Sequence, residues 1–145
     1  MIPAVLLTGG DEILLSAART ALVAELVGEG DPTLVVAELA GDDYEMRELV
    51  DAAQTPPFLT DRRVVVGRGM SRFGKDDHAL LVGYLADPLE TTVLVLEWSG
   101  ARVPKAVSEA VVAAGGEVRA TGPGRKIADW ASAQLAEAGL RPDRD

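Results

Sequence analysis

The fold of this chain is decided by residues 5–15, Val5-Leu6-Leu7-Thr8-Gly9-Gly10-Asp11-Glu12-Ile13-Leu14-Leu15. An apolar run of strand length comes first, and two glycines end it. Asp11 and Glu12 then suit the positive end of a helix dipole, so a helix is expected to follow. Its apolar face is expected to contain Ile13, Leu14, Ala17, Ala21 and Val23 or Ala24. Together these residues predict the first strand and helix of a parallel α/β sheet.

The same alternation of apolar runs and helical periods continues along the chain. Strands are expected at residues 3–8, 33–38, 63–67, 91–98 and 117–121. Helices are expected at residues 11–28, 42–54, 76–86, 104–114 and 126–138, with Asp42 or Asp43 as the cap of the second. We therefore expect a single α/β domain at residues 1–140 with a mostly parallel five-stranded sheet, and the start of a linker at residues 141–145.

Composition and charge exclude several classes of function. The chain has 23 acidic and 14 basic residues among 145, and its formal net charge of -9 should repel a phosphate backbone. Direct nucleic-acid binding by this chain is therefore disfavoured. The absence of Cys favours a reducing, cytoplasmic setting, and no apolar run approaches the roughly 20 residues that cross a bilayer. We expect a soluble protein without a membrane partner.

One loop resembles a phosphate-binding motif. Residues 69–76, Gly69-Met70-Ser71-Arg72-Phe73-Gly74-Lys75-Asp76, match seven of the eight positions of G-x-x-x-x-G-K-[ST]. A P-loop nucleotide-binding enzyme that uses Gly69–Lys75 is therefore one hypothesis. Asp76 argues against it, because the motif needs a hydroxyl there to bind Mg²⁺ and a carboxylate would repel the phosphates. The alternative is an ordinary loop before a helix.

Other catalytic patterns are weaker. The single His78 lies in a polar stretch, and no spacing of His and carboxylate residues resembles a metal site. Gly9 and Gly10 follow the first strand, but a complete G-x-G-x-x-G is absent and Asp11 would face an anionic ligand. We therefore expect no cofactor, no metal and no catalytic residue.

The most unusual stretch joins the second helix to the third strand, residues 54–63, Gln54-Thr55-Pro56-Pro57-Phe58-Leu59-Thr60-Asp61-Arg62-Arg63. Its two prolines stiffen the backbone, and Phe58 and Leu59 follow where a loop is normally polar. A rigid turn with two large apolar side chains suits a protein-binding hot spot. The same side chains could instead fold back beneath the sheet, and the residues alone leave both possibilities open.

Three stretches together resemble the N-terminal domain of the delta subunit of the bacterial DNA polymerase III clamp loader. The first is residues 5–15, quoted above. The second, which is the most specific, is Pro57-Phe58-Leu59-Thr60-Asp61-Arg62-Arg63-Val64-Val65-Val66. The third is Lys126-Ile127-Ala128-Asp129-Trp130, followed by Leu135 to Leu140. The resemblance spans essentially the whole chain in the same order of elements.

The resemblance implies a RecA-like, AAA+-like three-layer domain with a degenerate P-loop, in which Gly9, Gly10 and Asp11 stand where a nucleotide would bind. It implies that a helical domain and a collar domain follow this one in the whole subunit, and that the other clamp-loader subunits are bound through those missing regions. The chain itself would be non-catalytic, since ATP would be used by neighbouring subunits.

The resemblance also implies a partner for the unusual turn. Pro57, Phe58, Leu59, Thr60 and Arg62 would contact the sliding clamp, which is the beta subunit, and help to open its ring during DNA replication. Phe58 and Leu59 would insert into a hydrophobic pocket of the clamp. Leu59 stands where the family usually has an aromatic residue.

Overall fold

The computed structural model describes residues 2–41, 43–57, 59–100 and 102–121. The strands in this part of the chain are β1 (Ala4–Gly9), β2 (Val36–Leu39), β3 (Arg63–Gly67), β4 (Thr92–Ser99) and β5 (Glu117–Ala120). The helices are α1 (Glu12–Val27), α2 (Pro32–Val35), α3 (Met46–Gln54), the 3-10 turn η1 (Met70–Arg72), α4 (Lys75–Leu85) and α5 (Lys105–Ala113). The expected helix at residues 126–138 and the expected linker at residues 141–145 lie outside the described residues.

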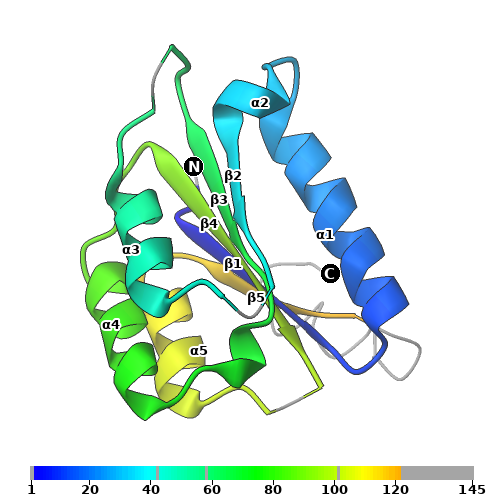
Figure 1. The fold of residues 1–145 in the computed structure, drawn as a ribbon, viewed down its shortest axis with the longest axis vertical. Helices are drawn as coiled ribbons and strands as arrows, with labels where there is room; N and C mark the ends of the chain where they lie inside the picture. Colours follow the sequence, from blue (N-terminus) through cyan, green and yellow to red (C-terminus); the bar gives the residue numbers. More distant parts are fainter. Residues whose placement is uncertain (1, 42, 58, 101, 122–145) are drawn as a thin grey trace.

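The strands form one parallel sheet in the order β2-β3-β4-β1-β5. The connection from β1 to β2 crosses the sheet toward the β2 side. The connections from β2 to β3, from β3 to β4 and from β4 to β5 all cross it toward the β5 side. Because such connections are right-handed, the two directions place their helices on opposite faces. Figure 1 shows α1 and α2 on one face and α3, α4 and α5 on the other. The expected three-layer α/β fold is confirmed.

The sheet is buried between two apolar layers. Successive side chains of a strand point to opposite faces, so Ala4 and Leu6 of β1 pack toward α3, α4 and α5 whereas Val5 and Leu7 pack toward α1. Residues 92–98 of β4 are all buried, which agrees with its expected place in the middle of the sheet. Each such Val or Leu contributes about 1.5–3 kcal/mol by leaving water.

The expected apolar face of α1 is wrong except at Val23, which is partly buried against the core. Leu15 and Leu22 are the buried residues of this helix, whereas Ile13 is 80% exposed and Leu14 is 39% exposed. The apolar residues of α1, many of them alanine, are distributed over most of its circumference, so their periodicity does not indicate which side of the helix is buried.

The expected second strand begins too early. Thr33 to Val35 belong to the one-turn helix α2, and β2 begins at Val36. The Asp31 carboxylate caps α2 by accepting the Thr33 N–H at 2.9 Å, and Pro32 suits its first position. This local capping overrides the β-propensity of the stretch.

The expected cap of α3 is also wrong. This helix begins at Met46, after Glu45, whose N–H donates to the Glu48 carboxylate at 2.8 Å. Asp43 precedes that cap, and Asp42 lies outside the described residues.

Candidate functional site

The segment between α3 and β3, residues 55–62, is called the apolar turn below. At its start the Thr55 hydroxyl donates to the Asp51 carbonyl at 2.8 Å. Just beyond its end the Arg63 guanidinium donates to the Ala52 carbonyl at 3.2 Å. Both ends of the apolar turn are therefore fixed to the last turn of α3, which limits the freedom of the residues between them.

Leu59 has an unfavourable conformation in two respects. Its φ of 68° lies in the left-handed region, and no other non-glycine residue in the described part of the chain has a positive φ. An L-residue in this region costs about 1–2 kcal/mol. Its side chain is also 74% exposed. Strain of this kind clusters at functional sites, so the apolar turn is the first candidate for a binding site. Phe58 lies outside the described residues.

The remaining predicted residues of the apolar turn lie beside Leu59. Pro57 and Thr60 are half-buried, and Arg62 is exposed. The Thr60 hydroxyl donates to the Arg62 carbonyl at 2.8 Å, and the Arg62 guanidinium donates to the Leu26 carbonyl at 3.1 Å. Because Leu26 is in the last turn of α1, Arg62 ties the apolar turn to that helix.

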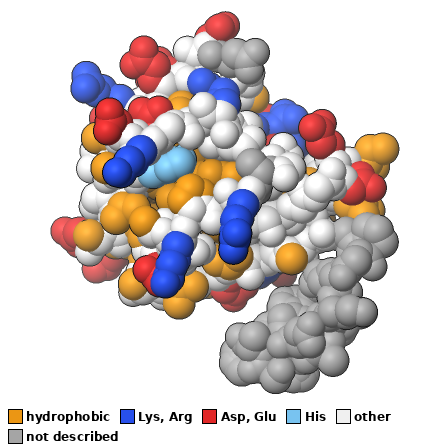
Figure 2. Space-filling view, turned by 90° about the horizontal axis from the view of Figure 1, so that it is seen from below, with side chains coloured by type: hydrophobic (Ala, Val, Ile, Leu, Met, Phe, Trp, Pro, Cys, Tyr) orange, Lys and Arg blue, Asp and Glu red, His pale blue; other side chains and the backbone are white. Residues whose placement is uncertain are grey.

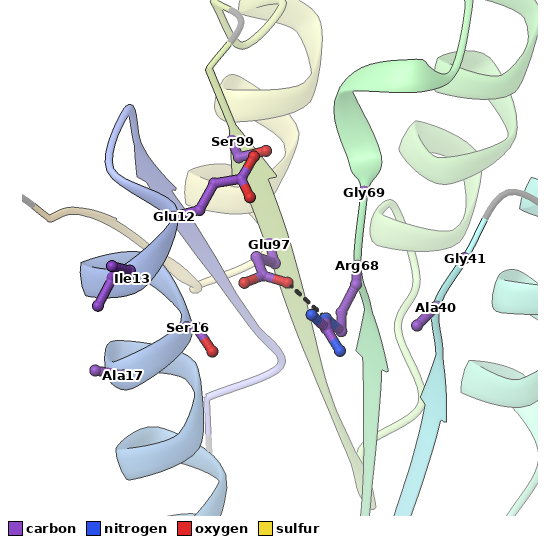
Figure 3. A pocket seen from close by; sticks show the side chains of 10 residues that line it. All are labelled: Glu12, Ile13, Ser16, Ala17, Ala40, Gly41, Arg68, Gly69, Glu97 and Ser99. Atoms are coloured by element: carbon purple, nitrogen blue, oxygen red, sulfur yellow. Dashed lines mark hydrogen bonds and ion pairs between the residues drawn. The ribbon is translucent and has the colours of Figure 1, made fainter.

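A crevice of about 760 Å³ lies at the opposite edge of the sheet, where the strands end. Its position agrees with the general rule that ligand sites of parallel sheets lie outside the carboxyl ends of the strands. Figure 3 shows the residues that line it, which come from α1 and from the ends of β2, β3 and β4. They are Glu12, Ile13, Ser16, Ala17, Ala40, Gly41, Arg68, Gly69, Glu97 and Ser99.

Glu97 is the centre of an ion network in the crevice. This glutamate is only 7% exposed, and its two oxygens accept from Arg19 at 2.8 Å and from Arg68 at 3.0 Å. Arg68 also donates to Glu38 at 3.1 Å. Burial lowers the pKa of Arg68, but its bonds to Glu38 and Glu97 outweigh that effect and raise the pKa above its usual value. The two carboxylates thus neutralise the two guanidinium groups.

Glu12 adds a further negative charge to the crevice. Its carboxylate makes no ion pair with another described residue, and Figure 3 shows it directed toward Ser99. The arginines that could attract a phosphate are already bonded to carboxylates. The crevice is therefore poorly suited to a nucleoside triphosphate.

The predicted degenerate nucleotide residues have local structural roles. The Asp11 carboxylate accepts the N–H groups of Ile13 at 2.9 Å and Leu14 at 3.2 Å, which are the groups that would bind an anion at the start of α1. A Cβ on Gly9 would clash with Oγ1 of Thr121, so the close approach of these two residues favours glycine. Gly9 and Gly10 also line a second cavity of about 530 Å³. A lost nucleotide site here stays a prediction.

The P-loop-like residues Gly69–Lys75 form a packed turn. Met70 and Phe73 are buried in the core. The Arg72 guanidinium lies 4.1 Å from the centre of the Phe73 ring and 4.6 Å from that of Tyr44. The loop is therefore filled by its own side chains, and its geometry does not favour the nucleotide-binding hypothesis.

The two sets of predicted site residues lie at opposite edges of the sheet. The apolar turn precedes β3 at the edge where strands begin (Figure 1). Gly9 is the last residue of β1, and Gly10 and Asp11 follow it, at the edge where strands end. Figure 2 views the latter edge, where basic and acidic side chains surround an apolar centre. In the described residues no group of His, Asp and Glu is arranged to hold a metal ion.

The sequence did not predict the partners of Glu97. Glu97 is the only charged residue in the strand expected at residues 91–98, and this was the one signal available in the sequence. Arg19 and Arg68 are 78 and 29 residues away along the chain, so only the fold brings them together.

Comparison with known proteins identifies the family. A family model described as DNA polymerase III, delta subunit matches residues 6–107, a region that contains both the apolar turn and Gly9–Asp11. A search of curated protein sequences finds no significant match.

Two solved structures have a similar fold. The Bacillus subtilis DNA clamp loader delta protein has a TM-score of 0.62 and 15% identity over 92% of this chain and 43% of its own. A DNA polymerase III gamma subunit-related protein from Thermotoga maritima has a TM-score of 0.60 and 15% identity over 92% of this chain and 46% of its own. At this identity the two structures support the fold alone, and the chain spans less than half the length of either.

The family model covers well over half of the chain, and the fold agrees with it. Within the described residues, no helix has both the length and the apolar character that crossing a membrane requires. The chain belongs to the DNA polymerase III delta subunit family.

Proposed function

We propose that this chain acts in a clamp loader during DNA replication and binds the sliding clamp, the beta subunit, through its apolar turn. The contact residues are Pro57, Phe58, Leu59 and Thr60, with Arg62 beside them. The observation that carries the proposal is Leu59, which is 74% exposed and has a φ of 68° in a member of the delta family.

The apolar turn has the physical properties of a small hot spot. Pro56 and Pro57 restrict the backbone, and hydrogen bonds at both ends hold it to α3. Binding then orders few additional groups, so more of the gain from burying Leu59 and Phe58 remains as affinity. Large side chains that fill a partner's pocket dominate the free energy of most interfaces.

Ring opening follows from differential binding. A protein that binds the open ring better than the closed ring shifts the equilibrium toward the open ring by its difference in affinity. The chain itself then needs no catalytic group, and ATP hydrolysis belongs to neighbouring subunits. A clamp variant that cannot close into a ring should therefore bind more tightly than the closed clamp, and equal affinities would contradict ring opening by this chain.

The test of clamp binding is a calorimetric titration of the organism's own sliding clamp with this chain and with its Phe58→Ala, Leu59→Ala double variant. We expect the double variant to lose binding while its circular dichroism spectrum stays unchanged. Leu80→Ala is the matched control, because Leu80 is an exposed leucine on α4, away from the apolar turn. Unchanged clamp affinity in the double variant would refute the proposal.

A further inference from the structure

The apolar turn is too small to form a whole interface. Specific protein complexes bury about 1,200–2,000 Å² in total, and two apolar side chains supply only part of that area. A partner that binds Leu59 must therefore also cover its neighbours at the same edge of the sheet.

The helix α2 is one of these neighbours. In the sheet, Val36 at the start of β2 is paired with Val64 of β3, so α2 and the end of the apolar turn precede adjacent strands. The helix also lies against β3. Figure 1 places α2 and the connection from α3 to β3 at the same, upper end of the molecule.

Leu34 is the large, exposed apolar side chain of α2. Its side chain is 40% exposed, whereas the next residue, Val35, is buried in the core. The Asp31 carboxylate holds this single helical turn by accepting the Thr33 N–H at 2.9 Å and the Thr33 hydroxyl at 2.7 Å. Leu34 is therefore presented on a fixed turn of backbone, as Leu59 is.

Arg62 links the apolar turn to the segment that carries Leu34. Its guanidinium bonds to the Leu26 carbonyl at the end of α1, and α1 leads through a short connection into α2. The residue that ends the apolar turn is thus tied to the element that precedes Leu34. This link favours one continuous surface over two separate patches.

We propose that Leu34 is a second apolar contact for the sliding clamp, at the same end of the sheet as Leu59. This inference rests on the proposed function, because its occupant is the same clamp that binds the apolar turn. Leu34 widens the apolar contact beyond the turn, and the Asp31 cap keeps it in place before the clamp arrives.

The test compares Leu34→Ala with Leu80→Ala in calorimetric titrations of the organism's own clamp. The two leucines are 40% and 45% exposed, so the variants remove similar exposed side chains from different surfaces. We expect Leu34→Ala to weaken clamp binding about fivefold, since only the exposed part of the side chain can become newly buried. Leu80→Ala should change the affinity by less than twofold.

Clamp affinity within twofold of the original chain in Leu34→Ala would overturn the inference. It would leave the proposed function intact as long as the Phe58→Ala, Leu59→Ala variant still loses binding. The other possible occupant of this surface is a second copy of this chain, and analytical ultracentrifugation tests for it. If Leu34→Ala abolishes self-association and leaves the clamp affinity unchanged, the inference is also overturned.

A second variant tests the same inference through the backbone. Asp31→Ala removes the cap of α2 without touching Leu34, so we expect it to weaken clamp binding as well. Combined with Leu34→Ala it should add little, because both changes remove one contact. Fully additive losses would show that the two residues act independently and would contradict this role for the cap.

Discussion

At the scale of single residues, Leu59 is unfavourable in two ways. Its backbone has a positive φ, which leucine rarely adopts, and its large apolar side chain is exposed to water. Glycine adopts a positive φ without steric cost, although it also loses more conformational freedom on folding. We therefore predict that Leu59→Gly leaves the free energy of unfolding unchanged or raises it by up to about 1 kcal/mol. Urea unfolding monitored by circular dichroism measures this.

Leu80→Gly is the control for this prediction. Leu80 is also exposed but lies inside α4, where glycine is expected to cost about 1 kcal/mol relative to a good helix former. An equal loss of stability in Leu59→Gly and Leu80→Gly would contradict the conclusion that Leu59 is strained.

The sequence predicted part of what is unusual about this residue. Two bulky apolar residues after two prolines were visible as an anomaly in a chain with only 4% aromatic residues. The positive φ was not predictable, because leucine has no preference for that region. The bonds that anchor the turn at Thr55, Arg62 and Arg63 were not predictable either, because they depend on the positions of α1 and α3.

At the scale of elements, the Glu97 network joins α1 to β3 and β4. Replacing Glu97 with Ala would leave the charges of Arg19 and Arg68 without their buried partner, and the Arg19 side chain is only 12% exposed. We predict that Glu97→Ala lowers the free energy of unfolding by roughly 3 kcal/mol. Chemical denaturation measures the change.

The control is Glu109→Ala, which removes the exposed pair between Lys105 and Glu109 on α5. Exposed pairs of this kind contribute below about 0.5 kcal/mol. Similar effects of the two substitutions would show that the Glu97 network does not stabilise the packing of α1.

The cap of α2 should respond to acid. Hydrogen bonds from the Thr33 hydroxyl and N–H lower the pKa of Asp31 below its ordinary value of 3.8. A carboxyl group with a lowered pKa stabilises the fold at pH values above its unfolded pKa, and this contribution is lost as the pH falls through the folded pKa. We therefore predict that the Thr33 amide resonance titrates with a midpoint below 3.8.

Asp31→Asn is the control for that titration, because asparagine also caps helices but carries no charge. The Thr33 amide should then lose this pH dependence. A midpoint at or above the ordinary aspartate value would show that the cap is not formed in solution.

Elements differ in how well the sequence predicts them. The strands at residues 63–67 and 91–98 were predicted almost to the residue, because continuous Val and Leu runs have one stable place, the centre of a parallel sheet. The buried side of α1 and the start of β2 were not. The first depends on tertiary packing around an alanine-rich helix, and the second on one capping residue, Asp31.

At the scale of the whole molecule, the two edges of the sheet have different chemistry. The apolar turn and Leu34 lie where the strands begin, while the carboxylates and arginines of the crevice satisfy one another where the strands end. The sequence does not predict this network, because its members come from α1, β2, β3 and β4 and only the fold brings them together. The general fold, by contrast, followed from the alternating pattern of the chain.

This arrangement gives a prediction about nucleotides. Titration with ATP and Mg²⁺ should produce no binding heat, because Asp11 occupies the first amide groups of α1 and the crevice arginines are paired. Micromolar binding that Lys75→Ala removes would instead support the nucleotide-binding hypothesis for Gly69–Lys75.

The central claim is that this domain binds the sliding clamp through the apolar turn, and Leu59→Gly tests it most directly because folding and binding should separate in this one variant. The measurement is the dissociation constant for the organism's own clamp, determined by calorimetry beside the stability of the same sample. We predict that Leu59→Gly weakens binding at least about 30-fold, as for a hot-spot residue, with no loss of stability. Affinity within twofold of the original chain at unchanged stability would contradict the account.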